Sequence, residues 1–302
     1  MKKSLCHFNR AICYSGYRRG QRPGHAYPSY KEVWEDLKLL AGRFRYLRLY
    51  DCTPHADIVL QVIEKERLPF QVMLGAYIEA EMNNPQCPWG GMHDDQVLRN
   101  NRKRNEEEVQ RCIGLANRYR DIVMAVSVGN EATVDWNDHM VPVERVVHFV
   151  QQVKAAVAQP VTFCENYVPW TTKLAPLAEV VDFISIHTYP EWEQKSIDQA
   201  LDYTKENYYS VANRYPGKPV IITEAGWTTT SNGRGIPPML DSEENQLRYL
   251  SELLHWSRHN ELLTFIFEAF DENWKGSDDP AEPEKHWGIY REDRTPKLAA
   301  SL

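Results

Sequence analysis

The sequence predicts a single (β/α)8 barrel that spans residues 1–302 as one domain. Two observations indicate this fold. Short apolar segments alternate with longer amphipathic segments along the whole chain, which is the order of elements in α/β proteins. The short segments are β-branched or aromatic and nearly continuous in apolar residues, as expected of strands buried on both faces of a parallel sheet. No linker, low-complexity tract or internal repeat divides the chain.

The predicted strands are recognised by their apolar residues and by the polar or turn-forming residues that follow them. In chain order they cover residues 10–16, 46–51, 70–77, 122–131, 161–166, 181–189, 219–227 and 264–272. An open doubly wound sheet is the alternative arrangement. It is less favoured because the segment SGYRRGQRPG after the first strand has neither the G-x-G-x-x-G nor the Walker spacing of a phosphate-binding loop.

The predicted helices carry apolar residues at helical spacing. The first covers residues 29–42, with Val33 and Leu37 on one face, Ser29 as the N-cap and Gly42 as the stop. We expect a final turn in the last eleven residues. The remaining predicted helices cover residues 55–67, 104–120, 141–159, 171–179, 195–215 and 241–260.

Charge and hydropathy exclude several kinds of partner. The net charge of -7 and the pI near 5.8 argue against a nucleic-acid or anionic-membrane partner, because binding phosphates requires a basic surface. No apolar run is long enough to cross a membrane. The first residues contain two lysines but lack the apolar stretch of a signal peptide. We expect a cytoplasmic monomer, or alternatively a secreted or periplasmic protein whose leader has been removed.

The cysteines form no Cys-x-x-Cys pair and no compact framework. Several fall inside apolar segments, which favours buried free thiols and a reducing compartment over disulfides. The six are Cys6, Cys13, Cys52, Cys87, Cys112 and Cys164.

Chemically capable side chains follow many of the predicted strands. Active sites of (β/α)8 barrels lie at the C-terminal ends of the strands, so these residues are expected to meet at one mouth. Glu131 closes the fourth strand and Glu224 stands near the end of the seventh. One polar residue at a strand end is commonly a cap, but two glutamates on opposite sides of one mouth indicate a site. The other candidates are Tyr14, Arg48, Asp51, Asn130, His187, Tyr189, Trp227, Glu272, Trp274 and Lys275.

Two carboxylates that flank a reacting bond are what glycoside hydrolysis requires. One protonates the leaving oxygen, and the other attacks the anomeric carbon or activates a water molecule. Their pKa values must differ, so one needs partial burial and the other needs hydrogen-bond donors or a nearby cation. Arg48 is a candidate donor to the nucleophile, and the Trp and Tyr rings can stack on sugar rings.

Three motifs together resemble glycoside hydrolase family 17, the β-1,3-glucanase family. They are VGNE, which closes the fourth predicted strand, ITEAGWT, which closes the seventh, and the pair FEAFDENWK and PEKHWGIY after the eighth. The segment YSGYRRGQ after the first strand is similar to the bacterial and fungal form more than to the plant form. The resemblance implies that Glu131 is the general acid/base, that Glu224 is the nucleophile and that Asn130 binds the sugar 2-hydroxyl. It also implies retention, for which the carboxyl groups lie about 5–5.5 Å apart.

Further positions also match the family. The resemblance implies that Glu272, Lys275 and Glu284 lie around the acid, and that Tyr189 is the tyrosine found after the sixth strand. His187 departs from the plant form, which has Asn-Val-Tyr where this chain has His-Thr-Tyr. The role of this histidine is left open.

The implied activity is hydrolysis of β-1,3-glucosidic bonds in laminarin-type glucans or laminari-oligosaccharides by double displacement. The alternative is transglycosylation through the same covalent intermediate. No cofactor or metal is expected. Residues 78–95 are rich in Pro, Gly and Asn and predict a loop. This loop either builds a wall of the cleft with Trp89, which bears on endo or exo action, or is a surface loop with Trp89 packed down.

Other functions have less support in the residues. A metal-dependent barrel hydrolase usually carries His-x-His, which is absent. His255 and His259 are one helical turn apart but lack the glutamate of His-Glu-x-x-His. No G-x-S-x-G segment supports a serine hydrolase. A glucan-binding barrel without activity would need the aromatic residues but not the paired glutamates.

Overall fold

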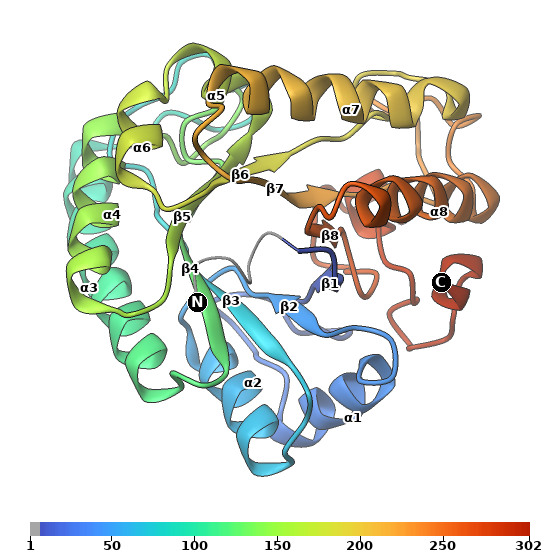
Figure 1. Cartoon of the computed structure of the whole chain (residues 1–302), viewed down its shortest axis with the longest axis horizontal. Coiled ribbons are helices and arrows are strands. Elements are labelled where there is room, and N and C mark those ends of the chain that lie inside the picture. Colours follow the sequence, from blue (N-terminus) through green and yellow to red (C-terminus); the bar gives the residue numbers. More distant parts are fainter. Residues whose placement is uncertain (1–6) are drawn as a thin grey trace.

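The computed structural model describes residues 7–302 and confirms the (β/α)8 barrel. Eight parallel strands close on themselves in chain order, with β8 pairing back to β1 (Figure 1). The strands are β1 (Arg10–Cys13), β2 (Tyr46–Arg48), β3 (Gln71–Ala76), β4 (Val123–Asn130), β5 (Val161–Asn166), β6 (Ile184–His187), β7 (Val220–Ala225) and β8 (Thr264–Ile266).

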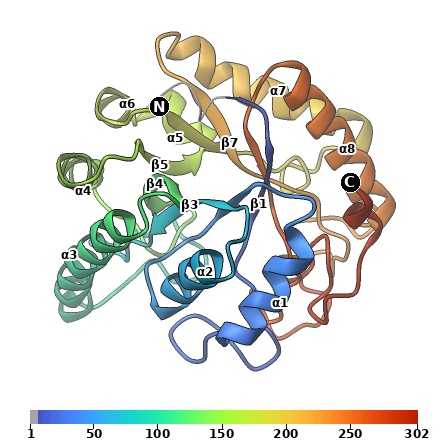
Figure 2. The same cartoon turned by 60° about the horizontal axis from the view of Figure 1, so that its bottom comes forward.

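The helices form a layer around the barrel, as Figure 2 shows. They are α1 (Tyr30–Leu40), α2 (Pro54–Lys65), α3 (Asp95–Arg118), α4 (Val143–Ala156), α5 (Tyr167–Thr172), α6 (Ala175–Val180), α7 (Ile197–Arg214) and α8 (Glu243–His259), with short 3-10 turns η2 (Pro283–Lys285) and η3 (Leu298–Ser301). The predicted cap of the first helix is confirmed, because Ser29 and Glu32 form a reciprocal capping box. The predicted final turn is η3.

Helix α3 begins at Asp95, nine residues before the predicted start at residue 104. Its first half lacks an apolar stripe because amide side chains make its inward contacts. Asn101 donates to the carbonyl of Ala80 at 2.8 Å, and Asn105 donates to the carbonyl of Glu79 at 2.9 Å. A helix face that packs through hydrogen bonds does not produce the hydrophobic period on which the prediction relied.

Strand β8 ends at Ile266, although the apolar run predicts a strand to residue 272. Beyond this point the backbone keeps single hydrogen bonds to Ala225 of β7 and Cys13 of β1 and also pairs with the C-terminal segment. Glu268 and Asp271 donate their amides to the carbonyls of Trp287 and Tyr290 at 3.2 and 2.9 Å. The residues after β8 are thereby directed across the barrel mouth.

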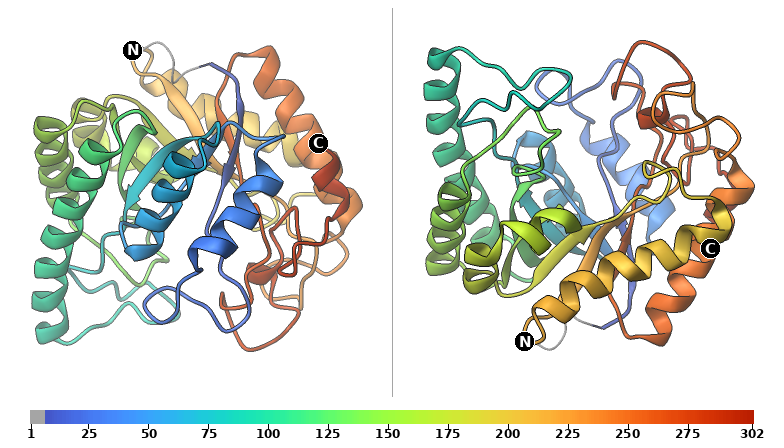
Figure 3. Two further views of the ribbon diagram at one scale, coloured as in Figure 1. Left: turned by 90° about the horizontal axis from the view of Figure 1, so that it is seen from below. Right: turned by 90° about the horizontal axis from the view of Figure 1, so that it is seen from above.

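The long loops after β1, β3 and β8 project from one end of the barrel. In the left panel of Figure 3 they lie along the lower edge. The C-terminal ends of all parallel strands face this end, so it is the end at which a barrel active site forms.

The barrel interior and the layer under the helices are both apolar. Cys13, Met73, Cys164 and Phe265 belong to the interior cluster, while a larger cluster lies between strands and helices. The five cysteines from Cys13 onward are free thiols, as predicted, and Cys6 lies outside the described residues. Among residues 7–302 no helix is both long and apolar enough to span a membrane.

Candidate active site

The two predicted catalytic glutamates meet at the barrel mouth. Glu224 lies on β7 and is paired in register with His187 on β6. Glu131 directly follows β4, where the ladder with β5 shifts register between Ser127 and Asn130. Gly129 adopts φ +95° and Glu131 φ +47° at this irregularity. Such a bulge re-aims the side chains that follow it, and here it brings Glu131 to the site.

One carboxylate oxygen of Glu131 and one of Glu224 lie within 4.8 Å of each other. His187 stands between them, with Nδ1 2.9 Å from Glu131 Oε1 and 3.5 Å from Glu224 Oε2. An oxygen–oxygen distance of this size agrees with the short carboxyl separation of about 5–5.5 Å found in retaining glycosidases.

Glu224 is held ionised by donors on both of its oxygens. Arg48 and Tyr50 contact Oε1, the latter at 3.0 Å, and Tyr189 donates to Oε2 at 2.5 Å. Burial alone would raise the pKa of Glu224. The positive charges of His187 and Arg48 and the hydrogen bonds from Tyr189 and Arg48 outweigh it and lower the pKa to about 2. The predicted role of Arg48 as a donor to this carboxylate is confirmed.

His187 is fully buried, and its imidazole is positively charged at neutral pH. Burial opposes the charge, but the charge of Glu224 and the contacts with Cys164 and Glu131 raise the pKa of His187 to about 10. Glu131, His187 and Glu224 are spaced so that they could hold a metal ion. Their electrostatics fit a proton better, because Nδ1 donates to Glu131, forms an ion pair with Glu224, and Arg48 already neutralises Glu224.

His187 predicts a pH-dependent contribution to stability. Its pKa rises from an ordinary 6.5 to about 10 on folding. The stabilisation is therefore complete below pH 6.5 and is lost as the pH rises toward 10. We expect the free energy of unfolding, measured with urea, to fall between pH 6 and pH 9.5 in the native chain. The fall should be smaller in His187→Asn, and His255→Asn on the exposed face of α8 should match the native chain. Equal falls in all three proteins would contradict the assignment.

Asn130 is oriented by the same arginine. Its Oδ1 accepts from Arg48 Nη2 at 2.5 Å, and its backbone carbonyl contacts His139 at 2.9 Å. Among residues 7–302 the amide nitrogen of Asn130 has no hydrogen-bond partner, so it is free to donate to a ligand.

A second group of charges lies beside the glutamates. Lys275 contacts both oxygens of Glu268 at 2.8 and 2.9 Å and Glu272 at 2.7 Å. Glu284 lies in the electrostatic reach of both Glu131 and Glu224. Burial and the negative charges of Glu131, Glu282 and Glu224 raise the pKa of Glu284, whereas the positive charge of Lys275 lowers it. The net result is a pKa of about 7 for Glu284. The residues expected around the acid are therefore brought together.

Replacing Lys275 with methionine is expected to lower the free energy of unfolding by about 3–5 kcal/mol, because two buried carboxylates lose the cation they share. Chemical denaturation measures the change. The control is Lys173→Met, whose ion pair with Asp135 is far more exposed and should contribute about 0–1 kcal/mol. A similar small loss in both variants would contradict a structural role for Lys275.

Two predicted substrate contacts are wrong in this structure. Trp227 is fully buried, donates Nε1–H to the carbonyl of Leu240 at 3.0 Å and packs on Tyr249 of α8. Tyr14 is 1% exposed, and its hydroxyl donates to Asp36 at 3.2 Å. Both side chains point away from the mouth because they fall on the opposite face of the strand from the residues that reach the site.

The remaining candidates lie near the mouth. Asp51 is half-buried and accepts two hydrogen bonds from Thr53. Trp274 is 37% exposed and packs edge-on against Tyr17. Sequence reasoning missed Tyr50 as a site residue, although it is two residues after Arg48 and therefore shares its face of the strand.

The loop of residues 77–94 lies beside the acid. Asn84 donates to the carbonyls of Asp135 and Asn137 at 2.9 and 2.8 Å, and Asn137 donates to the carbonyl of Glu131. Trp89 is 57% exposed, which contradicts the alternative in which it is packed down. The loop is thus attached through hydrogen bonds to the segment that carries Glu131.

Comparisons with known proteins agree with this geometry. Residues 11–288 match the family model of the BtgE/BtgC glycoside hydrolase domain. A glucan 1,3-β-glucosidase of Arthroderma benhamiae is 28% identical over 194 residues, covering 60% of this chain and 62% of the relative. A putative glucan endo-1,3-β-glucosidase, btgC, of Aspergillus niger is 25% identical over 301 residues, covering 91% of this chain and 40% of the relative. The chain thus spans less than two thirds of the length of these relatives.

Solved structures share the fold. An endo-laminarinase from Formosa Hel1_33_131 superposes with a TM-score of 0.86 at 26% identity, covering 98% of this chain and 87% of that one. A family 17 β-1,3-glucanosyltransferase from Rhizomucor miehei superposes with a TM-score of 0.73 at 21% identity, covering 96% of each chain. The match over residues 11–288 shows that this chain belongs to the BtgE/BtgC glycoside hydrolase domain family, which confirms the resemblance inferred from its motifs.

Proposed function

We propose that this protein is a retaining glycoside hydrolase that cleaves β-1,3-glucosidic bonds of laminarin-type glucans or laminari-oligosaccharides. The observation that carries the proposal is the pair Glu131 and Glu224, whose oxygens lie within 4.8 Å, with Glu224 held ionised at neutral pH. The substrate class is supported by family membership and by the names of the relatives.

In the first step Glu224 attacks the anomeric carbon while Glu131 gives its proton to the leaving glycosidic oxygen. A covalent glucosyl ester forms on Glu224, and the aglycone departs with the proton. Arg48, Tyr50 and Tyr189 keep the attacking carboxylate ionised and oriented until the bond forms. Asn130 is placed to donate to the hydroxyl next to the anomeric centre.

In the second step Glu131 removes a proton from a water molecule, which attacks the same carbon and releases Glu224. Having given up its proton in the first step, Glu131 acts as the base in the second step. Because the carbon is attacked twice, from opposite faces, the product keeps the β configuration.

Proton NMR of the first product from laminarin tests the proposal. We expect the β anomer to appear first and to mutarotate later. The α anomer first, or no release of reducing sugar from laminarin or its oligosaccharides, would overturn it. The same reaction followed by chromatography separates the modes of action. Glucose alone indicates exo hydrolysis, a ladder indicates endo hydrolysis, and products longer than the substrate indicate transfer by the alternative route.

A further inference from the structure

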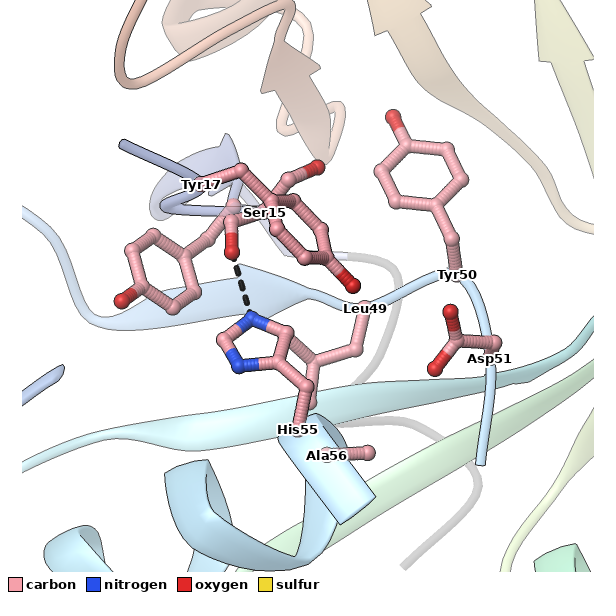
Figure 4. Close-up of a pocket in the computed structure, with 8 residues that line it drawn as sticks. Ser15, Tyr17, Leu49, Tyr50, Asp51, His55 and Ala56 are labelled. Carbon is pink, nitrogen blue, oxygen red and sulfur yellow. Dashed lines mark hydrogen bonds between the residues drawn. The ribbon is translucent and has the colours of Figure 1, made fainter. Parts of the chain in front are cut away.

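A small pocket with a mixed polar and apolar lining lies at the ends of β1 and β2 (Figure 4). Its volume is about 20 Å³, enough for a single water-sized group. Tyr50, whose hydroxyl contacts Glu224, forms one side of it. Tyr17 and Asp51 form another, with the hydroxyl of Tyr17 directed toward the carboxylate of Asp51 in the view of Figure 4.

The hydroxyl of Tyr17 is buried without a partner. The side chain is 3% exposed, and within residues 7–302 its oxygen makes no hydrogen bond. Its ring is held by His55, Tyr27 and Trp274 at centroid distances of 5.2, 6.4 and 5.9 Å. A buried polar group without a partner costs stability, so such a group in a native fold calls for an explanation such as an absent ligand.

Asp51 offers the complementary acceptor. Its Oδ1 accepts from the amide and hydroxyl of Thr53 at 3.0 and 2.6 Å, whereas Oδ2 has no partner in the described part of the chain. Burial and the charges of Asp51 and Glu272 raise the pKa of Tyr17, so its hydroxyl keeps its proton. Tyr17 thus supplies a proton donor and Asp51 a carboxylate acceptor, while His55, which also lines the pocket, has its Nδ1 buried without a partner in the described residues.

A neutral hydroxyl matches this chemistry. It can accept from Tyr17 and donate to Asp51 at the same time, whereas an anion is repelled by Asp51 and Glu272. Tyr50 bridges the pocket and Glu224, so the hydroxyl belongs to the sugar bound next to the reacting bond. The partly exposed ring of Trp274 lies against Tyr17 and gives this sugar a flat apolar face.

We propose that Tyr17 and Asp51 form a hydroxyl-binding pocket that takes one free hydroxyl of the glucosyl unit bound beside Glu224 and rejects units substituted at that oxygen. The inference rests on the proposed glucan hydrolysis and specifies how the same site recognises its substrate. The pocket itself, at about 20 Å³, takes a group of the size of a hydroxyl.

The test combines Tyr17→Phe with a panel of laminaritriose analogues, each lacking one hydroxyl. We expect Tyr17→Phe to lower kcat/KM on laminaritriose by about 10- to 100-fold, the range for one hydrogen bond to a buried group. With the native chain, one analogue should show a kcat/KM reduced by a similar factor. With Tyr17→Phe, the same analogue should react almost as fast as laminaritriose, because the hydroxyl of Tyr17 and the missing sugar hydroxyl are the two partners of one contact. Tyr30→Phe is the matched control, because its hydroxyl contacts Glu66 on the outer surface.

Stability separates this role from a structural one. Tyr17→Phe should fold with unchanged or higher stability, because its hydroxyl has no partner to lose. Asp51→Asn should keep the oxygen that accepts from Thr53 but weaken the contact with the sugar hydroxyl that this analogue lacks. Unchanged kcat/KM in Tyr17→Phe, or additive losses for every analogue, would overturn the pocket.

Binding affinities for the same panel, measured by calorimetry in Glu131→Gln, are independent of turnover. If Tyr17→Phe, added to Glu131→Gln, removes the difference in affinity between laminaritriose and its analogues, the pocket is supported. This holds even if the native chain fails to hydrolyse laminarin, a result that would overturn only the proposed function. No discrimination among the analogues would overturn the pocket.

Discussion

Replacing Glu224 with alanine is expected to reduce hydrolysis of laminarin by about 10⁴–10⁶-fold, the scale of losses on removing a catalytic nucleophile. The reason is that, among residues 7–302, only Glu224 is a carboxylate held ionised where it can attack the anomeric carbon. The release of reducing sugar from laminarin measures the loss, with Glu224→Gln as a companion that keeps the size of the side chain.

The alanine variant also leaves a vacant space between two cations, Arg48 and His187. A small anion such as azide should enter it and restore cleavage of an activated aryl glucoside. Because azide then attacks from the face that Glu224 occupied, the expected product is the α-glucosyl azide. Rescue also shows that the variant is folded. Substantial hydrolysis without azide would exclude Glu224 as the nucleophile.

Glu131→Ala is expected to lower hydrolysis of laminarin by about 10²–10⁴-fold, the typical contribution of a general acid/base. The size of the loss should depend on the leaving group. An aryl β-laminaribioside with a dinitrophenolate leaving group needs no protonation, so its first step should remain fast and only the second should slow. Stopped-flow absorbance should then show a burst of dinitrophenolate.

In this variant azide should again accelerate turnover, but the product should be the β-laminaribiosyl azide, because azide attacks the laminaribiosyl ester on Glu224. Glu107→Ala, at an exposed position of α3, is the control and should behave as the native chain. An equal loss on the activated and natural substrates would contradict an acid/base role for Glu131.

Most of the fold was predictable because burial on both faces makes parallel strands continuously apolar. Glu131, Glu224 and Arg48 were predictable because strand ends of a closed barrel converge. The errors at Tyr14 and Trp227 come from neglecting the alternation of strand side chains. Trp227 is three residues after Glu224 and so falls on the opposite face, toward α8.

Other parts of the site had no local signal. The pairing of Glu268 with Lys275 occurs in an irregular segment, where no period relates sequence position to direction. His187 matched no plant-type residue, and its bridging position follows only from the register of β6 and β7. The expectations of a cytoplasmic monomer without a nucleic-acid partner stay predictions.

The hydrogen bonds from Asn84 to residues 135 and 137, and from Asn137 to the carbonyl of Glu131, join the 77–94 loop and Glu131, the proposed acid, into one cooperative unit. Local opening of this loop frees the backbone that positions the acid, even though the barrel strands stay intact. Insertions or proteolytic cleavage in the loop are therefore expected to lower activity, because they destabilise the loop and the segment of residues 131–137 together. The temperature at which activity is lost is then set by this loop and not by the barrel.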